Sequence, residues 1–206
     1  MPSDLSIECH HPDGKTVSNV ETDAWELKAS RRGLLNLKTL LYGQPMHDLL
    51  KTQLEEADAF YKQLILDFNG EYKESRIYLK AKNFKSSYFM DWQKQIAEVM
   101  KSEEVKRDFF LKSVATAHPE HYAMPAYPAG IIETIGEHVA RVQVRPDLSV
   151  PDFVKAYGDP SYVSIPVTGL MDDDTVLFYV LHEFRDAEDG SGCDIILRLL
   201  FPAAAP

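Results

Sequence analysis

The hydrophobic pattern of the sequence changes near residue 130, and this change limits the available folds more than any other feature. Before it, apolar residues recur at helical spacing, and after Gly130 they form alternating or β-branched runs broken by turn residues. The links between these runs are short, which predicts hairpins and an antiparallel sheet. Helices followed by strands predict an α+β fold in which a curved antiparallel sheet wraps against helices. We divide the chain into an N-terminal arm with a helical region, 1–114, and a sheet region, 115–206, which form one folded unit.

Four helices are predicted in the first region from apolar spacing and capping residues. Two of them cover about 22–41 and 45–68, and two more begin near Ser86 or Ser87 and at Ser102. The first helix offers an apolar side formed by Trp25, Leu27, Leu34, Leu37 and Leu41. The second has a longer stripe formed by Leu50, Leu54, Ala57, Tyr61, Leu64 and Phe68. A stripe of this length is typical of a core or a dimer seam, so we expect a homodimer.

Charge and composition narrow the range of partners. The 206 residues carry a formal net charge of -10, which disfavours binding to nucleic acid or to anionic lipid surfaces. The longest apolar runs are far shorter than the roughly 20 residues of a membrane-spanning helix. Two cysteines, Cys9 and Cys193, are too few for a disulfide framework, so we expect a cytoplasmic protein. The lysine-rich and aromatic stretch 71–89 is expected to be a solvated connector.

Potential metal ligands are concentrated between residues 115 and 138. His118 and His121 lie at the end of the predicted fourth helix, and Glu133 lies in the strand that follows. Two imidazoles and a carboxylate are ligands that zinc takes, although histidine is also common in a last helical turn because the dipole favours a cation there. We expect Glu133 to approach His121, or His118 as its alternative, because only eleven residues separate His121 from Glu133.

A second candidate pair lies in the apolar run 175–186. Both alternating sets of side chains in this strand are apolar, so either His182 or Glu183 points into the protein. A buried polar group needs a partner, and one at the end of an apolar pocket is typical of a site for a small hydrophobic molecule. His182 is therefore either a hydrogen-bonded core histidine or a site residue that acts as a base or a metal ligand.

Several short segments together resemble the zinc-dependent phloroglucinol hydrolase family, typified by 2,4-diacetylphloroglucinol hydrolase. These segments are HPEH at 118–121, IIETIG at 131–136, LHEFRD at 181–186 and LRLLFP at 197–202. The resemblance implies a helix-grip fold, a dimer, and cleavage of a carbon–carbon bond between an acyl group and an aromatic ring. It also implies a zinc ion, with His118 or His121 and Glu133 at the positions of two of the family's ligands.

The family's other two zinc ligands lie on a C-terminal helix that has no counterpart in this sequence. If the metal is retained, its missing ligands come from elsewhere, with His182 and Glu183 as candidates. We then expect a metal-assisted hydrolase or lyase that acts on an acylated phenol or a polyketide-like ketone, with an acid such as Glu183 or Tyr122. If the metal has been lost, we expect a metal-free isomerase, cyclase or dehydratase that uses a carboxylate and a histidine. A non-catalytic binding protein is the remaining alternative.

Overall fold

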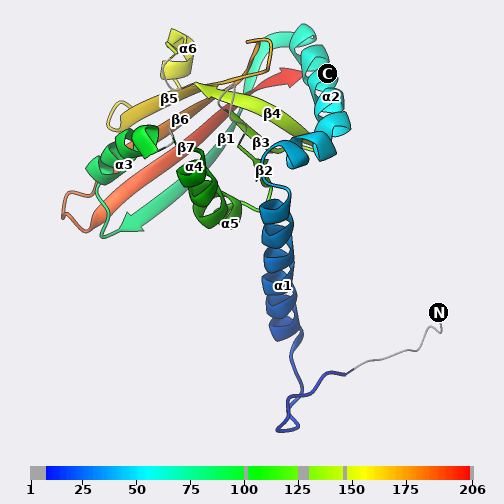
Figure 1. The fold of residues 1–206 in the computed structure, drawn as a ribbon. Helices are drawn as coiled ribbons and strands as arrows, with labels where there is room; N and C mark the ends of the chain where they lie inside the picture. Colours follow the sequence, from blue (N-terminus) through cyan, green and yellow to red (C-terminus); the bar gives the residue numbers. More distant parts are fainter. Residues whose placement is uncertain (1–7, 100–101, 125–129, 146–147, 205–206) are drawn as a thin grey trace.

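The protein folds around one strongly curled antiparallel sheet. The structure is a computed structural model and describes residues 8–99, 102–124, 130–145 and 148–204. Seven strands form a half-barrel, and the N-terminal helices precede it (Figure 1). The predicted α+β fold with a curved antiparallel sheet is thus confirmed. In the described part of the chain, no helix has the length and apolar character needed to cross a membrane.

The helices begin close to the residues that capping patterns predict. They are α1 (Asn19–Leu40), α2 (Gln44–Leu66), α3 (Ser86–Val99), α4 (Glu103–Phe109), a π-helical turn η1 (Phe110–Val114), α5 (Ala115–Ala117) and α6 (Asp152–Lys155). Ser18 caps α1 in a reciprocal capping box with Glu21, and Ser102 is the N-cap of α4. Pro45 lies in the first turn of α2, where its missing N–H is not needed.

The strands pair in an order that combines one long crossover with consecutive hairpins. They are β1 (Phe68–Lys82), β2 (His121–Ala123), β3 (Gly130–Ile135), β4 (His138–Arg145), β5 (Val163–Leu170), β6 (Val176–Asp186) and β7 (Gly192–Ala204). Their order across the sheet is β1-β7-β6-β5-β4-β3-β2, and every pair is antiparallel.

The prediction of a connector over 71–89 was wrong, because most of this stretch belongs to β1. This strand is fifteen residues long and pairs with β7 at the edge of the sheet. Most of its side chains are exposed on both faces, including Ile77, Tyr78 and Leu79. It therefore lacks the alternation of apolar and polar residues that reveals a half-buried strand, and its lysines suit an edge strand that must avoid further pairing.

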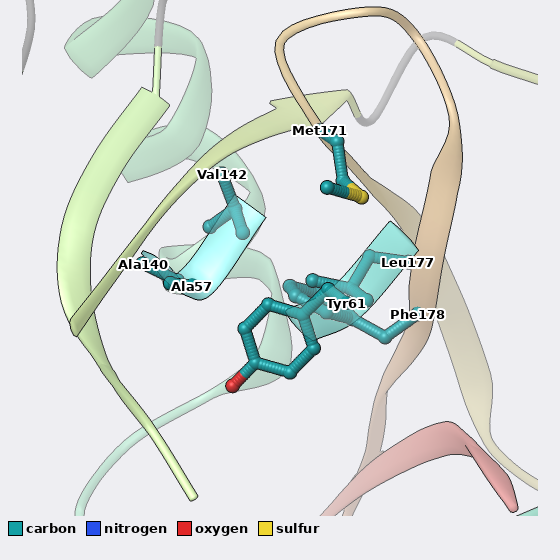
Figure 2. Packing of buried hydrophobic residues seen from close by; sticks show 7 residues of the cluster. All are labelled: Ala57, Tyr61, Ala140, Val142, Met171, Leu177 and Phe178. Carbon is teal, nitrogen blue, oxygen red and sulfur yellow. The ribbon is translucent and has the colours of Figure 1, made fainter. Parts of the chain in front are cut away.

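Helix α2 fills an opening in the half-barrel where two strands separate. β4 pairs with β5 only through Gln143–Arg145, so the rest of β4 pairs on one side alone. There Ala57 and Tyr61 of α2 pack against Ala140 and against residues of β6, as Figure 2 shows. The predicted stripe on α2 is thus largely covered within the chain, with Leu54 and Leu64 half-buried.

The two faces of β6 pack against different helices. Tyr179 and Leu181 share one face with Glu183 by alternation and pack against Val154 of α6. Phe184 shares the other face with His182, and its ring lies 4.6 Å from that of Phe89 in α3. The sheet is therefore covered by helices on both sides of β6.

Helix α1 is much more exposed to solvent than the sequence predicts. It extends away from the sheet, and its main contacts with the body are those of its C-terminal end with α5 and η1 (Figure 1). Trp25, Leu27 and Leu37, which were predicted to form part of a buried side, are about half exposed, at 48%, 52% and 55%. The apolar spacing predicted the helix correctly, but the body of the protein does not cover that side.

Candidate functional site

The structure brings His121 and Glu133 together at the edge of the sheet. β2 and β3 pair so that these two residues lie opposite each other. His121 Nε2 lies 2.6 Å from Glu133 Oε2, and the two side chains retain 19% and 21% of their exposure. The pair is therefore shielded from most of the solvent but remains within reach of a ligand.

The geometry of this pair determines which imidazole nitrogen can react. A carboxylate at hydrogen-bond distance accepts the N–H of Nε2, which leaves the lone pair of neutral His121 on Nδ1. His121 Nδ1 is buried and has no hydrogen-bond partner among the described residues. Glu133 orients the ring of His121 and leaves the second ring nitrogen unprotonated. This is how a carboxylate supports a histidine that acts as a general base.

His118 stacks on His121 instead of turning toward a shared ligand. The two ring centroids are 3.9 Å apart, and the ring planes differ by only 15°. Partial desolvation of its ring, followed by the neighbouring His121, holds the pKa of His118 below its usual value, so its imidazole is neutral at pH 7 although the residue is largely exposed. Parallel stacked rings do not direct their lone pairs at one point, and the described residues contain no group of three or more His, Cys, Asp and Glu side chains placed to hold a metal. These side chains as placed do not fit a zinc ion.

Lys38 joins this cluster from α1, and nothing in the sequence pattern predicts it. Its side chain is fully buried, and its ammonium donates hydrogen bonds to the carbonyl oxygens of Pro119 at 2.5 Å and His118 at 3.4 Å. Burial lowers the pKa of Lys38 to about 8. The ammonium also lies 5.7 Å from the ring centre of Tyr122. Lys38 thus anchors the segment that carries both histidines.

Tyr122, a candidate acid, follows His121 in β2 and contacts different groups. Its hydroxyl lies 3.2 Å from Thr134 Oγ1, and its ring packs with Leu50 of α2 and Ile132. Successive residues of a strand point to opposite faces, so Tyr122 points away from the side that carries His121. We therefore do not place it in the His121–Glu133 pair.

Glu183 is fully buried and belongs to an ion-pair network on the α6 side of the sheet. Arg198 Nε donates a hydrogen bond to one carboxylate oxygen of Glu183. The backbone N–H of Asp159 donates to the other at 2.5 Å, and Arg198 Nη1 also donates to Glu74 at 2.9 Å. These contacts occupy both oxygens of Glu183 and account for its burial without a ligand.

His182 lies on the opposite face of β6 and far from Glu133. It pairs with Ile165 on β5 and Leu197 on β7, so its neighbours across the sheet are apolar. β6 and β3 are three strand spacings apart, about 14 Å, and the registers separate His182 from Glu133 by about eight further residues, roughly 26 Å along the strands. The structure therefore does not bring His182 or Glu183 to the His121–Glu133 pair as replacement ligands.

The apolar surroundings of His182 lead to a prediction about stability. Its Nδ1 is buried without a partner among the described residues, so replacing it with leucine should raise the free energy of unfolding by about 1 kcal/mol. Burial lowers the pKa of His182 in the folded protein. The unfolded chain therefore binds a proton first as the pH falls below about 6.5, and the advantage of His182→Leu should grow at acidic pH.

Thermal melts at neutral and mildly acidic pH test this prediction. The exposed His10, replaced by leucine, is the control and should change the melting temperature little. A marked destabilisation by His182→Leu would show that the imidazole has a stabilising partner and would contradict the assignment.

An open hollow lies at the turn between β3 and β4, and neither His121 nor Glu133 is among its lining residues. It has a volume of about 570 Å³, and its lining includes Phe60, Tyr61, Ile135, His138 and Phe201. Ile135 is two residues from Glu133 and on the same face of β3 by alternation, a separation of about 7 Å. The hollow is mainly apolar and aromatic, as sites for small hydrophobic molecules usually are.

No protein-family model and no curated protein sequence matches the chain.

Proposed function

We propose that the protein is a metal-free acid–base enzyme acting on a hydrophobic ketone or acylated phenol, with His121 and Glu133 as its reacting pair. The observation that carries this proposal is the 2.6 Å contact between His121 Nε2 and Glu133 in a half-buried position. A carboxylate in this position favours one tautomer of the imidazole and stabilises the imidazolium that forms when Nδ1 accepts a proton.

His121 Nδ1 takes a proton from the carbon next to the carbonyl group, or from a phenol hydroxyl, and later returns it. His118 is exposed and stacks on His121, so it is the side chain that must move when a substrate reaches the buried Nδ1. Its lowered pKa keeps it neutral at pH 7, so it adds no positive charge that would oppose protonation of His121.

The hollow beside β3 supplies a place for the apolar part of the substrate. His138 stacks on Phe60 with ring centroids 4.1 Å apart, and Tyr61 contacts both His138 and Phe201 edge to face. A wall of rings favours a planar aromatic molecule. Lys73 also lines this hollow and could attract a phenolate or carboxylate group.

Exchange of the methyl protons of a hydroxyacetophenone in D2O, followed by proton NMR, tests the proposed base. We expect the protein to accelerate exchange, and His121→Gln to reduce the acceleration by about 100-fold or more because a positioned general base contributes 10²–10⁴-fold. Glu133→Gln should also reduce it, since the amide cannot stabilise the imidazolium.

Glu188→Gln is the matched control for the carboxylate. Glu188 is exposed in the turn between β6 and β7 and does not line the hollow, so its amide variant should retain the exchange rate of the wild type. Exchange at the buffer rate with wild-type protein, or an unchanged rate with His121→Gln, would overturn the proposal.

A metal-assisted hydrolase that cleaves a carbon–carbon bond in an acylated phenol or polyketide-like ketone is the second candidate. It is favoured by the types of side chain that lie near one another, His118, His121 and Glu133, although His118 would have to turn from its stacked position to share a metal with His121. Elemental analysis of protein purified without a histidine tag tests it. A stoichiometric zinc content that disappears in His121→Gln would support this candidate over the metal-free one.

The cysteines support a proposed location in the cytoplasm. Cys9 is exposed, Cys193 is buried, and both are free thiols. A reducing compartment keeps such thiols unpaired. Fractionation of cells that express the tagged protein tests this proposal.

A further inference from the structure

We propose that α1 pairs antiparallel with α1 of a second copy of the chain, and that this helix pair is the dimer interface. The proposal is independent of the proposed reaction. It rests on an apolar stripe of α1 that its own body covers only at one end, and on the distribution of charge along the helix.

The stripe follows a strict seven-residue spacing. It consists of Val20, Leu27, Leu34 and Leu41, a repeat that keeps one seam of a helix facing a partner helix. Its C-terminal members, Leu34 and Leu41, are half-buried where α1 meets the body. Its N-terminal members continue past the body, where Val20 is 77% and Leu27 is 52% exposed.

The free part of α1 is long enough to hold a second helix. Residues 19–33 precede the docked end, which corresponds to about 22 Å of helix at 1.5 Å per residue. An isolated helix of this length is marginal in water even with a good N-cap, so most of its stability must come from packing. A second copy of α1 provides that packing because the seam is apolar in both copies.

The charges along α1 set the direction of pairing. Its N-terminal half carries Glu21, Asp23 and Glu26, whereas 27–37 contains three basic residues and no acidic one. An antiparallel pair places the acidic half of each helix beside the basic half of the other, while a parallel pair would place like charges together.

Two-fold symmetry then covers the exposed apolar stripe of α1 in both copies at once. The exposed Val20 end of one helix meets the C-terminal end of the other, where Leu37 is 55% exposed. This arrangement uses the same surface patch of both subunits, as a two-fold interface requires.

Sedimentation equilibrium of the full chain tests the interface. We expect the wild type to be a dimer at micromolar concentration and Leu27→Glu to weaken the dimer by roughly 100-fold, because a carboxylate would be buried in an apolar seam. Ala29→Glu adds the same charge on the opposite side of α1, at another exposed residue, and should remain a dimer. Matching melting temperatures for the two variants would show that Leu27→Glu folds.

Cysteine cross-linking in a Cys9→Ser background tests the direction of pairing. Ser30 lies near the centre of the pair, so Ser30→Cys should form a disulfide between subunits. Val20→Cys should not, because antiparallel helices hold their ends far apart. A monomeric wild type, a dimer that survives Leu27→Glu, or efficient cross-linking of Val20→Cys would each overturn the proposal.

Discussion

Replacing Arg198 with methionine is expected to lower the free energy of unfolding by about 3–5 kcal/mol, because it leaves a buried carboxylate without its ion partner. Glu183 is fully buried and Arg198 is 6% exposed, so neither charge can be solvated by water when the other is removed. The network also holds Glu74, which accepts from Arg198 Nη1 at 2.9 Å. Urea unfolding measures the loss.

Two further variants separate the buried ion pair from simple loss of charge. The double variant Glu183→Leu, Arg198→Met replaces both charges with apolar groups of similar size and should recover much of the lost stability. Arg76→Met removes the more exposed arginine that binds Glu74 and should lower the free energy of unfolding only slightly, because water screens this ion pair.

The outcome also decides how Glu183 is interpreted. A structural carboxylate makes Arg198→Met unstable and makes the double variant stable. If Arg198→Met is as stable as the wild type, the ion pair with Glu183 does not stabilise the fold, and the structural role of Glu183 is contradicted.

The four helices expected before residue 118 and the five strands after Gly130 were predictable because their signals are local, whereas the short α6 and β2 were not predicted. The capping box of Ser18 with Glu21 and the N-cap at Ser102 lie next to the helices they begin. The antiparallel strands after Gly130 alternate over short distances. β1 was missed because an edge strand with both faces exposed has no such alternation.

The candidate site was predictable only in part, for the same reason. His121 and Glu133 are joined by a short segment, and the contact between them agrees with the expectation drawn from the sequence. The different environments of His182 and Glu183 depend on the partners of β6. Arg198 reaches Glu183 only through the register of β6 with β7, which the sequence pattern does not reveal. Lys38 contacts a carbonyl 80 residues away, and a lysine on a helix carries no local sign of such burial.

The stability of the protein should rise between about pH 8 and pH 10.5 through the titration of Lys38. In the folded protein burial lowers the pKa of Lys38 to about 8 from 10.5. Between these values the unfolded chain binds a proton that the folded protein does not, so the free energy of unfolding increases with pH. Below pH 8 both states are protonated and the burial penalty is fully present; above pH 10.5 neither is, and the penalty is gone. The shift corresponds to about 3 kcal/mol at most.

Comparison with Lys38→Met isolates this contribution from the other groups that titrate at high pH. The variant lacks the ammonium, so the wild type should gain melting temperature relative to it as the pH rises from 8 to 10.5. Lys28→Met removes an exposed lysine from the same helix and should follow the wild type. If the wild type and Lys38→Met keep a constant difference, the ammonium is solvated in the folded protein. A rising difference would instead establish that α1 holds the His118–His121 segment through a cation whose burial opposes folding at neutral pH, and that this penalty is removed when Lys38 loses its proton.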